Sequence, residues 1–259
     1  MPRKQLKNKP LVEAILEVRW ALVAHATGQQ SDPYYKLLLG RLYDRLQEKY
    51  PEHEQLPTAI IPDEFVGYVV QHRFRTSAKG WPLIQLGPGI LTVNSTAEYT
   101  WEEVFRPRAV EAVERLYEAH PKKNELKITS LTLRYIDAVD FDYSKENAYD
   151  FLKKMLKVSV ELPTNLFDDS GVEKRPSMFA WHSTFECSNP KGQVTIRFAT
   201  GQKDNRPAIL WETMVQSVEG DVPPMPAGFE TWIDAAHTIT DDWFYKLIEG
   251  ELERRFDGD

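Results

Sequence analysis

Two segments of the chain alternate apolar and polar residues with the period of two that is typical of a half-buried β-strand. In the first segment, residues 10–20, one face carries Val12, Ala14, Leu16, Val18 and Trp20. In the second segment, residues 128–141, one face carries Leu131, Leu133, Tyr135, Val139 and Phe141. We expect each segment to be the opening strand of one half of the fold.

Helices are predicted in both halves where apolar residues recur at spacings of three and four. In the first half, one helix should follow Ser31-Asp32-Pro33 and end before Pro51, and a kinked helix, or a turn and a helix, should cover residues 101–120. Residues 147–158 predict a short helix in the second half.

The C-terminal segment, residues 228–256, carries a wide apolar stripe and predicts one long helix, or two helices broken near Thr240. The sequence Thr240-Asp241-Asp242 has the composition of a helix N-cap, in which a hydroxyl and acidic side chains satisfy free backbone N–H groups. We therefore interpret this acidic pair as a cap and not as a catalytic pair.

Further strands are predicted between the helices. Gly87-Pro88-Gly89 supplies a tight turn for a hairpin over residues 82–94. Two or three hairpin-linked strands follow in the second half, over residues 178–188, 193–201 and 208–218.

The order strand, helix, strands, helix therefore occurs twice, which predicts an α+β fold of mainly antiparallel sheet in two pseudo-repeats. The halves are residues 1–125 and 126–259, as two units or as one continuous domain. We expect them to join through their opening strands, since this buries two strand edges. Four charged residues are then candidates for the seam between the halves, namely Arg19 and Arg134 with their possible partners Glu17 and Asp137.

Composition narrows the class of protein. The 42% content of hydrophobic residues and 12% of aromatic residues exclude a largely disordered chain. A net charge of −7, with the acidic excess in the second half, argues against general nucleic-acid binding. No apolar run reaches the roughly 20 residues of a membrane span, and the first ten residues lack the apolar core of a signal peptide, so we expect a cytoplasmic protein.

Motifs for catalysis, cofactors and metals are missing. No GxxxxGK[ST] or GxGxxG sequence occurs, and the six histidines form no HExxH pair. The one cysteine, Cys187, permits no intrachain disulfide and, on a strand, points away from the face shared by His182 and Glu186. Asp168-Asp169 lies in a predicted turn. We therefore assign no catalytic, cofactor-binding or metal-binding residue.

Both ends of the chain resemble a sporadically distributed family of bacterial and archaeal proteins of about 250 residues. The resemblance lies in PLVEAI near the N-terminus and in AAHTITDDWFYKLIEG near the C-terminus. It implies an accessory protein from a mobile antiviral-defence locus, CRISPR-associated or similar, or from a toxin-linked locus, and it carries over no catalytic residue. The element order is also similar to the saddle of the TATA-binding protein and to helix-grip folds, but shared topology alone does not define a function.

Three functional hypotheses follow. The first is a non-enzymatic accessory subunit that binds a protein partner, with Trp81, Trp101, Leu247, Arg254, Arg255 and Phe256 as candidate contacts, because aromatic residues and arginine dominate binding hot spots. The alternative is a small-molecule sensor with a cavity between the sheet and the C-terminal helix, lined by groups such as Tyr135, His182 or Arg197. The third is a metal-dependent nuclease that uses scattered acidic residues.

Overall fold

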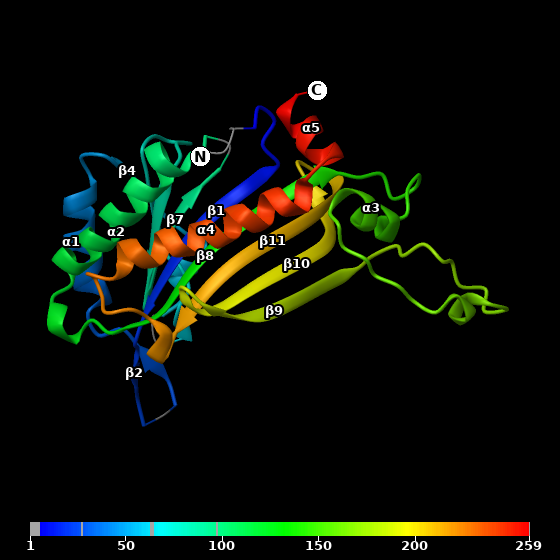
Figure 1. Ribbon diagram of the computed structural model, residues 1–259. Helices are drawn as coiled ribbons and strands as arrows, with labels where there is room; N and C mark the ends of the chain where they lie inside the picture. The colour runs from blue at the N-terminus through cyan, green and yellow to red at the C-terminus, as the bar shows by residue number, and fades with distance from the viewer. Residues whose placement is uncertain (1–5, 27, 63–64, 97, 259) are drawn as a thin grey trace.

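The computed structural model describes residues 6–26, 28–62, 65–96 and 98–258 of the chain. Within them, one antiparallel sheet has the strand order β4-β5-β6-β7-β1-β8-β11-β10-β9 (Figure 1). Its strands are β1 (Leu11–Trp20), β4 (Glu52–Gln55), β5 (His72–Arg75), β6 (Leu83–Gly87), β7 (Ile90–Ser95), β8 (Ile128–Asp140), β9 (Ala180–Ser188), β10 (Lys191–Lys203) and β11 (Arg206–Val218). A separate ribbon pairs β2 (Val23–Ala24) with β3 (Gln30–Ser31).

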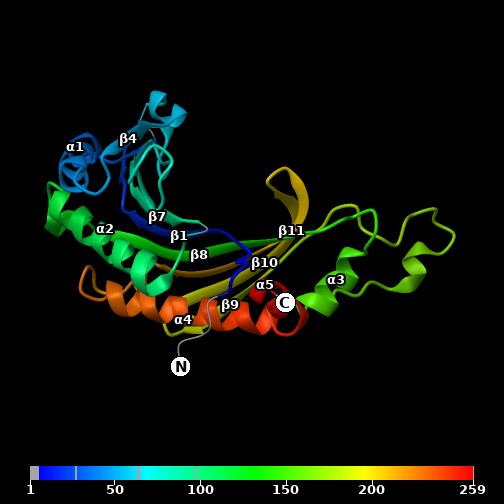
Figure 2. The same cartoon turned by 90° about the horizontal axis from the view of Figure 1, so that it is seen from above.

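Helices complete the α+β fold. The α-helices are α1 (Tyr35–Leu46), α2 (Arg106–Ala119), α3 (Ala148–Met155), α4 (Phe229–Ile248) and α5 (Glu251–Asp257). A π-helical turn, Trp101–Phe105, leads into α2, and short 3₁₀ helices cover Pro57–Ile60, Lys123–Glu125, Thr164–Phe167 and Glu219–Asp221. Figure 2 shows α2 and α4 along one side of the sheet, which we call the helix-covered face. Among the described residues, every helix is too short or too polar to span a lipid bilayer.

The two opening strands, β1 and β8, lie side by side in the middle of the sheet. They pair antiparallel, with Leu16 opposite Leu133 and Val18 opposite Leu131, and these side chains point to the helix-covered face. The register shifts between Leu11 and Glu13, which marks a β-bulge in β1. The bulge matters for the site below, because Leu11 lies opposite Asp137.

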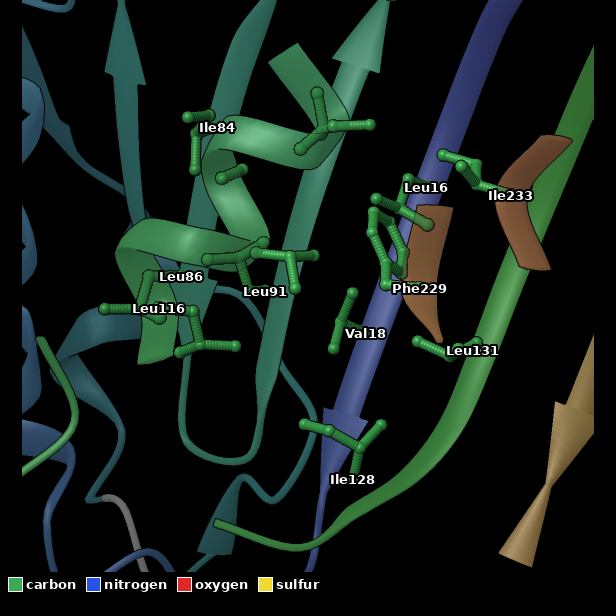
Figure 3. Close-up of a cluster of buried hydrophobic side chains, with 14 of the residues drawn as sticks. Leu16, Val18, Ile84, Leu86, Leu91, Leu116, Ile128, Leu131, Phe229 and Ile233 are labelled. Carbon is green, nitrogen blue, oxygen red and sulfur yellow. The ribbon is translucent and has the colours of Figure 1, made fainter. Parts of the chain in front are cut away.

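The apolar core forms two clusters under the helices. The larger one joins β1, β6, β7 and β8 to α1, α2 and the start of α4, and Figure 3 shows part of it, including Leu16, Leu91, Leu116, Leu131, Phe229 and Ile233. The smaller one joins β8, β10 and β11 to α3, α5 and the end of α4. Trp243 of α4 packs against both clusters.

The C-terminal segment is broken at a different point from the expected one. Thr240 lies inside α4, where its hydroxyl donates to the carbonyl oxygens of Ala236 (3.1 Å) and His237 (3.0 Å), so it caps no helix. The break falls at Glu249–Gly250, where Gly250 has a φ of 104°, a conformation that glycine adopts without steric cost.

Two glycines lead to opposite predictions for stability. Gly40 lies in the exposed middle of α1, where an added Cβ would have no atom within 4 Å, so Gly40→Ala should stabilise the protein by about 0.5–1 kcal/mol. At Gly87 a Cβ would lie 1.9 Å from the carbonyl oxygen of Val69, so Gly87→Ala should destabilise it by roughly 1–3 kcal/mol. Urea denaturation measures both changes, and equal effects of the two variants would contradict this account.

Candidate ligand-binding site

A cavity of about 410 Å³ lies between the helix-covered face of the sheet and α4. Its lining comes from segments far apart in the chain: the residues before β1, the turn that leads into α2, β8, β11 and α4. A volume of roughly 300–1,000 Å³ is typical of pockets that bind small molecules.

Asp137 is a buried carboxyl group in this lining. Side chains alternate along β8, so Asp137 shares the helix-covered face with Leu133, Tyr135 and Val139. It is 4% exposed, and among the described residues its side chain makes no hydrogen bond or ion pair. Burial raises the pKa of Asp137 to about 8, although the charge of Lys203 acts in the opposite direction. Burial therefore disfavours the charged form of Asp137 at neutral pH.

A chain of polar groups joins the wall of the cavity to α4. The hydroxyl groups of Tyr99 and Tyr135 are 2.9 Å apart, and the Tyr135 hydroxyl lies 3.1 Å from Nδ1 of His237. Burial raises the pKa of both tyrosines, so both remain protonated and can donate a hydrogen bond. The ring of Trp101 stacks on that of His237, with centroids 3.7 Å apart.

The π-helical turn places Trp101 at the cavity. The N–H of Phe105 donates to the carbonyl oxygen of Thr100 (2.8 Å), five residues earlier, so the turn holds one more residue than an α-helical turn. Such turns are frequent at functional sites. Thr100 also lines the cavity, although its hydroxyl is buried and has no hydrogen-bond partner among the described residues.

The charge of the lining is mainly negative. Carboxyl groups come from Glu102, Glu103, Asp137 and Asp241, whereas Lys9 contributes the one ammonium group among the described lining residues. Nζ of Lys9 donates to the backbone oxygen of Tyr99 at 2.6 Å. The site is therefore an aromatic and acidic cavity.

The seam candidates divide between the two faces of the sheet. Glu17, Arg19 and Arg134 are on the face opposite α2 and α4, which we call the open face. Nε of Arg19 is 2.7 Å from Oε1 of Glu17, and Nε of Arg134 is 3.9 Å from Oε2 of Glu212. Asp137 differs from the expectation, because three positions along a strand separate it from Arg134 and place it on the other face.

Of the three polar groups expected in a cavity, Tyr135 alone lies there. His182 and Arg197 lie opposite each other on β9 and β10. Arg197 also lies opposite Glu212, an open-face residue, so His182 and Arg197 are on the open face and cannot reach the cavity. His182 and Glu186 share that face, whereas Cys187 is on the other face and packs against the larger core cluster.

The partner-contact candidates lie in different surroundings. Trp101 lines the cavity. The ring centroid of Trp81 lies 5.6 Å from the guanidinium carbon of Arg75. Leu247 is half-buried and packs against the smaller core cluster. Phe256 is 6% exposed and its carbonyl oxygen accepts a hydrogen bond from the N–H of Asn8 (2.7 Å), so it belongs to the core. Arg254 and Arg255 are exposed.

Within the described ranges, no group of three or more His, Cys, Asp or Glu side chains is arranged to hold a metal ion. Comparisons with protein-family models, with curated proteins and with solved structures give no match. Functional proposals therefore depend on the geometry and the exposed surface of the described residues.

Proposed function

We propose that the protein binds a small molecule in the cavity between the sheet and α4 and acts as a regulatory protein. One observation carries the proposal: Asp137 is a carboxyl group in the wall of a cavity of about 410 Å³, buried and without a partner among the described residues. Leaving a buried polar group unpaired costs roughly 1–3 kcal/mol. A ligand that pairs with it removes that cost.

The surroundings of Asp137 support binding by shape as well as by charge. Aromatic rings of Tyr99, Trp101 and Phe244 line the cavity and offer apolar contact. The hydroxyl group of Tyr135 lies in the same lining and can orient a polar ligand. A mostly apolar cavity with a few convergent polar groups is the usual form of a ligand site.

A thermal-shift screen against small metabolites tests the proposal. We expect at least one compound to raise the melting temperature, because a ligand at 100 times its Kd adds about 2.7 kcal/mol of stability. Trp101→Ala should weaken binding of that compound at least tenfold, since it removes a wall of the cavity. Trp81→Ala is the matched control, because Trp81 lies outside the cavity lining, and it should leave Kd within twofold. Equal losses in both variants would contradict the assignment of this cavity.

Binding of a protein partner is the second candidate function. The observation that favours it is a long loop with exposed apolar side chains. Residues 157–179 extend beyond the sheet next to α3 (Figure 2). This loop exposes large apolar side chains, namely Leu162, Leu166, Val172 and Met178, which are 50%, 57%, 61% and 78% exposed. Exposed apolar residues gathered on one segment are a feature of interaction sites.

If the loop binds a protein partner, substitutions in the loop should remove partner binding without unfolding the protein. Leu166→Ser with Met178→Ser should remove a partner recovered from the native host, with little effect on folding because both side chains are exposed. Trp101→Ala should leave that recovery unchanged. A partner recovered equally by all three proteins would contradict docking on the loop.

Two finer hypotheses accompany these roles. We infer a pseudo-twofold relation between the halves, supported by the order of the sheet, in which β7, β6 and β5 follow β1 on one side and β11, β10 and β9 follow β8 on the other. Superposition of the two sets of strands measures it, and unrelated backbone paths would contradict it. We also retain the proposal of an accessory protein from a defence or toxin-linked locus, which the neighbouring genes test.

A further inference from the structure

We infer that the ligand of the cavity is a small molecule with a protonated amine, whose ammonium group pairs with Asp137 while its body packs against Tyr99, Trp101 and Phe244. The inference rests on the proposed ligand-binding function and adds the chemical class of the ligand. Four observations of the described residues carry it: the charge of the lining, the unpaired carboxyl group of Asp137, the aromatic rings and the placement of Lys9.

The charge of the lining favours a cation over an anion. Among the described lining residues, carboxyl groups come from three separate segments: Glu102 and Glu103 are exposed, Asp137 is buried, and Asp241 already interacts with another group. An anionic ligand would approach the exposed carboxylates of Glu102 and Glu103 and would also lose its hydration, which is unfavourable on both counts.

Lys9 does not supply an anion site either. Its Nζ is 2.6 Å from the backbone oxygen of Tyr99 and is held there as a donor. It therefore fixes the turn that carries the aromatic rings, and an anion would have to compete for it.

Asp137 gives the ammonium group a specific partner. A carboxyl group that is 4% exposed and makes no hydrogen bond within the described part of the chain has gained no protein donor in exchange for its lost exposure. A protonated amine supplies up to three N–H donors and the compensating charge, and charge-assisted hydrogen bonds are about twice as strong as neutral ones. A neutral alcohol supplies one donor and no charge.

Aromatic rings suit the same ligand. Trp101 and Tyr99 lie on the turn before α2, Tyr135 is on β8 and Phe244 is on α4, so rings approach the cavity from several directions. A cation near aromatic faces is attracted by the negative face of each ring. Apolar contact with the carbon skeleton of the amine adds to this.

A matched series of probes tests the inference directly: phenethylamine, 2-phenylethanol and phenylacetate share one ring and differ in the charge of the polar group. We expect isothermal titration calorimetry at pH 7.5 to give a Kd for phenethylamine at least tenfold lower than for 2-phenylethanol. Phenylacetate should show no measurable binding. The same three end groups on an aliphatic chain, as hexylamine, hexanol and hexanoate, repeat the comparison without the ring.

The variant Asp137→Asn tests whether Asp137 is the partner of the ammonium group. It keeps the shape of the side chain and removes the charge, so amine affinity should fall at least tenfold while alcohol affinity stays within twofold. Asp168→Asn with Asp169→Asn is the charge control, because it also makes the chain less acidic but lies in the distant loop. That double variant should bind the amine like the wild type.

The outcomes separate this inference from the proposed function. If alcohols or carboxylates bind as tightly as amines, and Trp101→Ala weakens them, the cavity is a ligand site and the amine assignment is wrong. If neither series binds at millimolar concentration, the amine assignment fails, while a hit from the broader metabolite screen would still support a ligand site. If Asp137→Asn leaves amine binding unchanged, Asp137 is not the partner and the inference fails.

Discussion

Removal of residues 249–259 should lower the free energy of unfolding by a large part of the roughly 5–15 kcal/mol that stabilises a protein domain. The removed segment contains α5, whose Leu252 is 0% and whose Phe256 is 6% exposed. Both pack in the smaller core cluster with residues of β8 and α3. Truncation of a buried leucine or phenylalanine to alanine costs about 2–5 kcal/mol each, and deletion also removes the hydrogen bond from Asn8 to Phe256.

Chemical denaturation of the truncated chain measures this loss. The control is Arg254→Ala with Arg255→Ala, because both side chains are exposed on the same helix, and it should change stability by less than about 1 kcal/mol. A truncated protein that unfolds at the wild-type midpoint would show that α5 is an appendage and would restore it as a candidate partner contact.

Asp137→Asn should stabilise the protein relative to the wild type increasingly as the pH rises from about 4 to 8. The pKa of Asp137 rises from 3.8 in the unfolded chain to about 8 in the folded protein because of burial. Between these values the unfolded chain releases a proton that the folded protein retains, so wild-type stability falls as pH rises through this window. Each pKa unit corresponds to about 1.4 kcal/mol, so we expect a change on the order of 3–5 kcal/mol.

Urea denaturation of both proteins at pH 5, 7 and 9 measures the difference. The other titratable groups of the described lining are present in both proteins, so their own contributions to the pH dependence of stability cancel in the comparison. These groups are Lys9, Tyr99, Glu102, Glu103, Tyr135, His237 and Asp241. Lys203 acts on Asp137 from outside the lining and is also present in both. Asp142→Asn is the control, since hydrogen bonds from Ser144 and Lys145 lower the pKa of Asp142 to about 2 and its titration lies below pH 5. A stability difference for Asp137→Asn that stays constant across pH would show that the carboxyl group is hydrated in the folded protein.

Local patterns in the sequence predicted most of the regular structure. Period-two alternation predicted β1 and β8, and the Gly87-Pro88-Gly89 turn predicted the hairpin of β6 and β7. The break of the C-terminal helix was misplaced because Thr240 resembles a cap in composition, whereas the positive φ of Gly250 has no signature beyond the glycine itself. The short strand β4 was not predicted, because Glu52–Gln55 carries no apolar residue and is exposed.

The sequence predicted only part of the site. A cavity under the C-terminal helix and the role of Tyr135 in its lining were expected, but Trp101, His237 and Asp137 come together only through tertiary packing. One local pattern does mark Asp137: it falls in the apolar series of residues 131, 133, 135, 139 and 141, where a charged side chain interrupts the apolar face of the strand. A charged residue inside an otherwise apolar stripe is a direct pointer to a site.

Helix α4 begins in one core cluster and ends in the other, and it also forms a wall of the cavity. Loss of packing in either cluster should therefore disturb the helix that both clusters share, and we expect the two clusters to unfold as one cooperative unit. The backbone amides in the middle of α4 should accordingly exchange with solvent only through global opening. A ligand bound in the cavity would make that opening less frequent, and amide exchange should then slow in both core clusters together.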